Sequence, residues 1–147
     1  MSSENKENKS YEVFLVGDTG NVQRYGHDPV LNTMRAHFND KQHSAVVFLG
    51  DNIYPRGLPD YGHALRKDAE DTLIAHKNAL SDYHGKILFI SGNHDWDKGK
   101  EDGFDYVIRQ EKYLKKLFGY NVMYPSGGCP GPTEININHQ FTIILIN

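Results

Sequence analysis

Several residue types and patterns are scarce in this chain of 147 residues, and each scarcity excludes a class of protein. The single cysteine, Cys129, excludes an internal disulfide framework and a cysteine-rich zinc module. No apolar run approaches the roughly 18 residues that a membrane-spanning helix needs. No basic run occurs and the net charge is -3, so nothing attracts the chain to nucleic acid or to anionic membranes. We therefore expect no nucleic-acid partner and no membrane segment.

The remaining composition is that of a soluble globular domain, with 38% hydrophobic and 24% charged residues. Residues 1–10 are rich in Ser, Asn, Glu and Lys, which predicts a disordered polar tail before a domain at 11–147. The tail has no apolar segment and so is no signal peptide. A cytoplasmic location follows if nothing precedes it, and a periplasmic or secreted one if the tail is the spacer behind a longer leader. Composition does not indicate an oligomeric state.

Three polar segments that each follow an apolar run carry the strongest signal. They read Gly-Asp-Thr-Gly at 17–20, Gly-Asp-Asn-Ile-Tyr at 50–54 and Gly-Asn-His-Asp at 92–95. The apolar runs before them, 13–16, 45–49 and 87–90, are typical of strands buried on both faces. The spacings of 33 and 42 positions from Asp18 to Asp51 and on to Asn93 each leave room for a strand–helix–strand crossover.

The helices of this βαβαβ pattern can be placed from their caps and apolar spacing. Asp28 and Pro29 begin a helix that ends near residues 39–40. A second helix is expected over 60–83, with His76 at the edge of its apolar stripe, and a third over 104–118, which Gly119 ends. The residues expected to form the buried stripes are Val30, Leu31, Met34, Phe38, Leu65, Ala69, Leu73, Leu80, Phe104, Val107, Ile108, Leu114, Leu117 and Phe118.

A Gly/Pro loop is expected over 125–132, and the last apolar run, 141–146, predicts a buried final strand. A buried strand as the last element would leave the sheet without its covering layer, so we expect a domain truncated at the C-terminus.

The three polar segments predict a metal centre, because the carboxyl ends of adjacent parallel strands share one crevice. Phosphoryl transfer to water uses two cations about 3.5–4 Å apart, which activate a water and neutralise the phosphate. Asp51 is the natural bridging ligand, since its loop lies between the other two. Asp18 and Tyr54 would complete one metal site and Asn93 would serve the other. His94 would hydrogen-bond the phosphate or protonate the leaving group.

These segments, in this order, resemble the calcineurin-like metallophosphoesterases. Gly20 after Asp18, and Tyr54 three residues after Asp51, resemble the purple acid phosphatase branch of that superfamily. The resemblance implies a four-layer αββα sandwich of which this chain is the first half. It also implies hydrolysis of a phosphomonoester by a metal-bound hydroxide, and two metal ions, iron with iron, zinc or manganese. Tyr54 would be a tyrosinate ligand of Fe(III).

Two other interpretations remain open. The family pattern also contains Val-x-x-His and Gly-His-x-His motifs that supply further ligands, and neither occurs in this sequence. The chain is then a non-catalytic truncated or degenerate domain with residual metal binding. A Rossmann-like nucleotide-binding domain shares the strand–helix order but lacks the glycine-rich phosphate loop.

Overall fold

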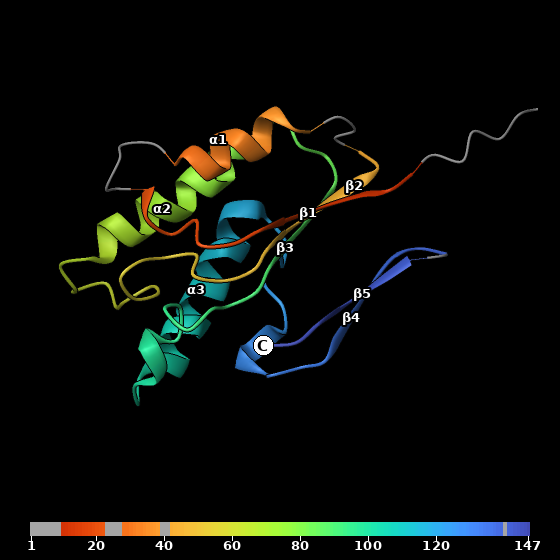
Figure 1. The fold of residues 1–147 in the computed structure, drawn as a ribbon. Helices are drawn as coiled ribbons and strands as arrows, with labels where there is room; N and C mark the ends of the chain where they lie inside the picture. Colours follow the sequence, from red (N-terminus) through yellow and green to blue (C-terminus); the bar gives the residue numbers. More distant parts are fainter. Residues whose placement is uncertain (1–9, 23–27, 39–41, 140) are drawn as a thin grey trace, which may run out of the picture.

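The computed structural model describes residues 10–22, 28–38, 42–139 and 141–147 (Figure 1). The predicted tail, apart from Ser10, therefore lies outside the described residues. Three parallel strands form a sheet in the order β1 (Glu12–Val16), β2 (Ser44–Phe48) and β3 (Lys86–Phe89). The three polar segments follow the ends of these strands, which confirms the α/β class and the βαβαβ order.

Three helices cover one face of the parallel sheet: α1 (Pro29–Ala36), α2 (Arg66–Ala79) and α3 (Gly103–Phe118). Every residue of β2 is buried, because β2 is central and both of its faces are covered. Successive side chains of a strand point to opposite faces, so Val46 and Phe48 join the core on the helix side. That core also includes Leu73 of α2 and Leu114 of α3.

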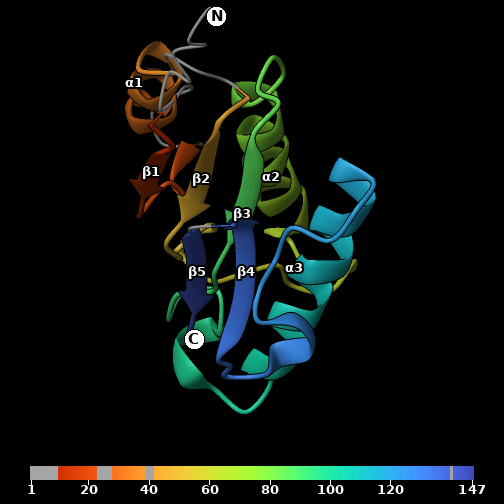
Figure 2. The same ribbon diagram turned by 90° about the vertical axis from the view of Figure 1, so that its right-hand side faces the viewer.

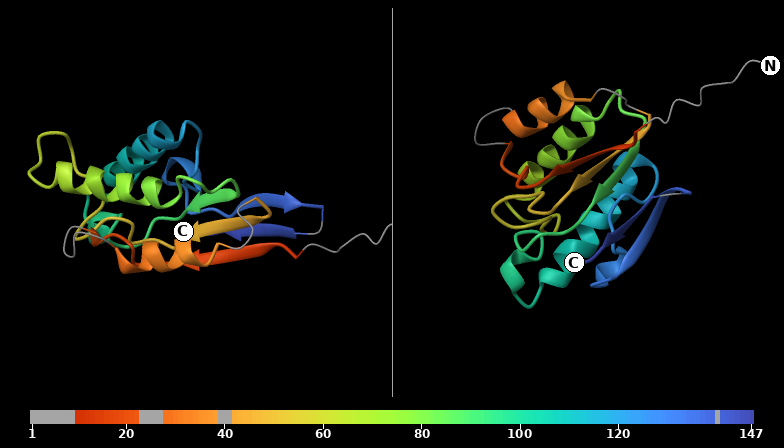
Figure 3. Two further views of the ribbon diagram at one scale, coloured as in Figure 1. Left: turned by 90° about the horizontal axis from the view of Figure 1, so that it is seen from above. Right: turned by 45° about the vertical axis from the view of Figure 1, so that its right-hand side comes forward.

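The opposite face of the sheet is covered by an antiparallel hairpin of β4 (Thr133–Asn138) and β5 (Phe141–Leu145). Figure 2 shows the hairpin in front of the parallel sheet with α2 and α3 behind it, and Figure 3 gives the same layers from two other sides. Leu145 packs there against Val47 and Leu88 in a second, smaller core. Residues 122–124 lie alongside β3, where Phe89 N–H donates to the Val122 carbonyl at 2.7 Å.

The predicted ends of α1 and α3 depend on capping. Asp28 Oδ1 accepts hydrogen bonds from the backbone N–H groups of Val30 and Leu31, as an N-cap should. Gly119 ends α3 in the left-handed conformation at φ 83°. The predicted end of α1 near residues 39–40 is wrong, because the helix ends at Ala36. Residues 39–40 themselves lie outside the described residues.

Two predicted elements differ in length or burial. The helix expected over 60–83 begins only at Arg66 and ends at Ala79, because residues 60–65 form turns in which Asp60 Oδ1 accepts from the Tyr61 N–H. The final strand was predicted to be buried, and that prediction is wrong. β5 pairs with β4, which the sequence did not reveal, and its Ile144 is 59% exposed.

Three side chains lie elsewhere than the helical spacing predicted. Val30 of α1 and Phe104 of α3 are exposed rather than part of the core, while His76 of α2 is completely buried rather than at the edge. Val30 lies in a groove of about 600 Å³ between α1 and the outer edge of β1, where Leu15 is 65% exposed.

No helix within the described ranges has the length and apolar character to cross a membrane.

Candidate metal centre

The Asp18 and Asp51 loops approach each other directly after β1 and β2. Both aspartates adopt positive φ angles, 58° and 52°, which turn each chain sharply at the strand end. The Asp18 N–H donates to the Gly50 carbonyl at 3.3 Å. Gly50 has a φ of 104°, and a Cβ atom placed there would lie 2.6 Å from the Cα of Gly92. Only a residue without a side chain fits between the second and third loops at this point.

The Tyr54 hydroxyl joins the two aspartates. It lies 2.6 Å from Asp18 Oδ1 and 2.9 Å from Asp51 Oδ2, as donor to both. Burial, followed by these two carboxylates, raises the pKa of the Tyr54 phenol above its ordinary value. In the absence of a bound cation the phenol therefore keeps its proton, which the two carboxylates share.

His94 is held against the same cluster by three contacts. Its backbone N–H donates to Asp51 Oδ1 at 3.0 Å, and its Nδ1 lies 2.7 Å from the Pro55 carbonyl. Its ring centroid lies 4.4 Å from that of Tyr54. Because a carbonyl oxygen can only accept, Nδ1 carries the hydrogen of this bond. The other nitrogen, Nε2, is then the atom that can exchange a proton with a ligand.

Asn93 lies between two residues that contact the Asp51 loop, Gly92 and His94. Its own side chain is exposed, and the hydrogen bonds described for the cluster do not include its amide. The structure thus links Asp18, Asp51, Tyr54 and His94 in one connected cluster, in which Tyr54 contacts the other three, and places Asn93 next to His94 on the third loop. The metal-ligand roles of Asp18, Asp51, Tyr54 and Asn93 all stay predictions.

Asp95 connects the second loop to the third through buried hydrogen bonds. It is completely buried, and its Oδ2 accepts from Gly92 N–H at 2.8 Å, from the Asn52 side-chain amide at 3.0 Å and from Asn52 N–H at 3.2 Å. Burial raises the pKa of Asp95 to about 6, although the hydrogen bonds to Gly92 and Asn52 oppose that rise. The Asn52 amide also donates to the Ile90 carbonyl. Asp95 therefore supports the site without facing it.

The sequence did not reveal the contact between Thr19 in the first loop and His76 of α2. Thr19 Oγ1 lies 2.7 Å from His76 Nε2, and His76 Nδ1 lies 2.8 Å from the Thr72 carbonyl. Burial lowers the pKa of His76, so its ring is neutral. The sequence offered one hint of this arrangement, which is the position of His76 three residues after Leu73 on the apolar stripe of α2.

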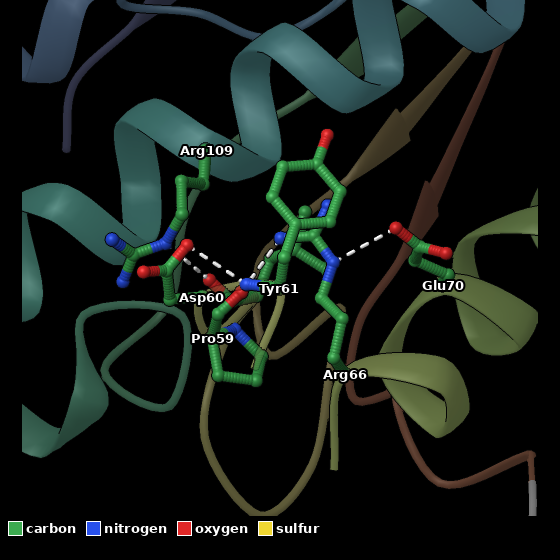
Figure 4. Close-up of polar contacts among 7 residues, drawn as sticks. Pro59, Asp60, Tyr61, Arg66, Glu70 and Arg109 are labelled. Carbon is green, nitrogen blue, oxygen red and sulfur yellow. Dashed lines mark hydrogen bonds and ion pairs between the residues drawn. The ribbon is translucent and has the colours of Figure 1, made fainter. Parts of the chain in front are cut away.

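Two arginines hold the loop between Tyr54 and α2 (Figure 4). Arg66 Nη1 donates to the Pro59 carbonyl at 2.6 Å, and its Nε donates to Glu70 at 2.8 Å. Its guanidinium lies over the ring of Tyr61, 4.1 Å from the centroid. Arg109 of α3 donates to the Leu58 carbonyl at 3.0 Å. These contacts anchor the loop to both α2 and α3.

The donor set suits a hard cation at the first position. Asp18 and Asp51 offer carboxylate oxygens and Tyr54 a phenolic oxygen that contacts both, so these three residues would hold the cation. Neither position has a complete set of ligands, and the second has only Asp51 and Asn93. Over the ranges that the structure describes, no three His, Cys, Asp or Glu residues are grouped so that they could hold a metal ion.

A comparison with known protein families gives one match. The family model described as Calcineurin-like phosphoesterase matches residues 11–142. No curated protein and no solved structure gives a significant match. The family generally binds two metal ions, and the match supports a metal-dependent phosphoesterase function of a general kind. The chain therefore belongs to the calcineurin-like phosphoesterase family.

Proposed function

We propose that this chain holds the metal-binding core of a phosphomonoesterase of the purple acid phosphatase type. One observation carries the proposal: the Tyr54 hydroxyl lies between the carboxylates of Asp18 and Asp51. A tyrosine three positions after the bridging aspartate is the feature by which the sequence resembles that branch. Asp18, Asp51 and Tyr54 would hold one ion, and Asp51 with Asn93 would hold the second.

The proposed roles follow from the contacts of each residue. When bound, the ions supply positive charge against the phosphate oxygens and activate the attacking water. Asp51 contacts the third loop directly, since the His94 backbone N–H donates to its Oδ1, and it is linked to the first loop through the Tyr54 hydroxyl, which lies against both Asp51 Oδ2 and Asp18 Oδ1. That position suits a bridging ligand. His94 is oriented through Nδ1 by the Pro55 carbonyl, so Nε2 is the atom that would carry the second proton of the imidazolium and give it to the leaving oxygen.

Metal binding should release a proton from Tyr54. The raised pKa of the phenol means that it is protonated at neutral pH before a cation arrives. A phenolate ligand must lose that proton, so metal affinity should rise with pH. An iron-loaded chain should then show a visible charge-transfer band.

Metal analysis combined with visible spectroscopy tests the proposal. The metal-free chain is titrated with Fe(III) and then with Zn²⁺ or Mn²⁺, and hydrolysis of p-nitrophenyl phosphate is followed in parallel. Tyr54→Phe should remove the visible band. Asp51→Asn should abolish metal retention and hydrolysis together, whereas His94→Ala should lower turnover while metal content survives. A visible band that persists in Tyr54→Phe would reject the tyrosinate role.

A second function is favoured by the incomplete ligand sets of both metal positions. Since the described residues group no three acidic, histidine or cysteine ligands, the chain would instead serve as a non-catalytic domain with residual metal binding. That function predicts one bound ion per chain and no hydrolysis above the rate of the free metal. Two bound ions with hydrolysis that depends on Asp51 would exclude it.

A further inference from the structure

We propose that His76 is a positioning residue for the Asp18 loop and acts through the hydroxyl of Thr19. The inference rests on the proposed function only in treating Asp18 as a metal ligand. Both members of the pair are completely buried, and their contact joins α2 to the loop after β1. The family resemblance does not account for this pair.

The direction of the hydrogen bond follows from the partners of the imidazole. The Thr72 carbonyl can only accept, so His76 Nδ1 carries the hydrogen. Burial lowers the pKa of His76 and keeps the ring neutral, which leaves a lone pair on Nε2. Thr19 therefore donates its hydroxyl hydrogen to Nε2. The tautomer of the His76 ring therefore determines the rotamer of the Thr19 side chain.

The position of Thr19 explains why its rotamer matters for the site. It lies directly between Asp18, at φ 58°, and Gly20, whose carbonyl accepts from the Tyr54 N–H at 2.9 Å. The segment that carries one carboxylate also contacts the backbone of the residue that carries the phenol. A shift of Thr19 would move Asp18 relative to Tyr54.

The surroundings of His76 keep the ring in place. Its centroid lies 5.0 Å from that of Phe48 and 5.8 Å from that of Phe89. These phenylalanines are the last residues of β2 and β3, the strands that lead into the other two loops. His76 therefore packs against the ends of β2 and β3 and forms a hydrogen bond with the loop that follows β1. One buried side chain thus contacts the first loop directly and the strands that lead into the second and third loops.

Paired substitutions test the proposal at both ends of the hydrogen bond. Thr19→Val and His76→Leu remove it, whereas Thr19→Ser and His76→Gln keep a donor and an acceptor. Leu73→Val serves as the control, because Leu73 is equally buried on α2 and its truncation does not touch the Thr19–His76 hydrogen bond. Amide hydrogen exchange over residues 18–21 is measured in the metal-free chain, and Mn²⁺ affinity is measured by electron paramagnetic resonance.

The two removing variants should accelerate exchange in the Asp18 loop and weaken Mn²⁺ binding about fivefold, the usual net effect of one hydrogen bond. The double variant Thr19→Val with His76→Leu should weaken binding no further than either single variant. Thr19→Ser and His76→Gln should restore most of the affinity, and Leu73→Val should leave it unchanged.

Unchanged exchange in Thr19→Val, with the chain folded, would overturn the proposal. Exchange that accelerates equally in Leu73→Val would overturn it too, because the effect would then be one of general stability. If the unaltered chain binds no Mn²⁺ while loop exchange still responds to Thr19→Val, the positioning role stands and the proposed metal function fails.

Discussion

Substituting Gly50 by alanine probes the close approach of the second and third loops. The new Cβ atom would lie 2.6 Å from the Cα of Gly92, where carbon atoms normally rest about 3.5–4 Å apart. The backbone must therefore move by about 1 Å. Overpacking of this kind costs about 1–3 kcal/mol, and a side chain at positive φ costs about 1–2 kcal/mol more. We expect Gly50→Ala to lower the free energy of unfolding by about 2–5 kcal/mol.

Gly99 provides the matched control, since it has a φ of 75° and open space around an added Cβ atom. Gly99→Ala should incur only the backbone cost of about 1–2 kcal/mol. Urea denaturation with a chelator present would measure both variants, at an unchanged dependence on urea concentration. A loss for Gly50→Ala no larger than that for Gly99→Ala would refute the close contact between the loops, and with it the common site.

Three further predictions concern pH, the anchored loop and the hairpin. Because the folded-state pKa of His76 is lowered, the contribution of His76 to the free energy of unfolding should be constant above about pH 6.5 and fall below it, by at most ~1.4 kcal/mol per pH unit. Urea midpoints across this range should show a weaker fall in His76→Gln, and an equal fall would count against the buried neutral ring. Arg66→Met should lower the free energy of unfolding by about 1–3 kcal/mol because it leaves a buried carbonyl without its donor, whereas Lys67→Met, at an exposed ion pair, should change it by less than about 1 kcal/mol in the same urea assay. Leu145→Ala should lower the melting temperature through a loss of about 2–5 kcal/mol, and the exposed Ile144→Ala should change it little; equal effects would contradict the packing of the hairpin.

The sequence predicted the parallel strands and the ends of two helices because those features depend on local rules. Buried strands need continuous apolar runs, Asp28 is a capping residue, and Gly119 takes a conformation that other residues avoid. The hairpin was not predicted, because β4 alternates between half-buried and exposed residues beside a Gly/Pro loop. Its partner strand pairs with it rather than with the parallel sheet, and apolar content alone does not specify the partner.

For the candidate site, motif order predicted which loops would meet but not what supports them. Asp18, Asp51 and Tyr54 could be named because each follows a strand within a short motif. The contacts of His76 with Thr19 and of Asn52 with Asp95 join residues 57 and 43 positions apart. Such contacts depend on how α2 and the loops pack, and no local spacing records them.

The outer side of β1 has a consequence for handling the protein. Among the described strands, β1 is hydrogen-bonded only to β2, and its other flank borders the apolar groove next to Leu15. Free backbone donors and acceptors beside exposed apolar side chains form a template for one more strand. Self-association of this chain should therefore increase with protein concentration, and dilute samples should give the cleanest measurements of metal binding.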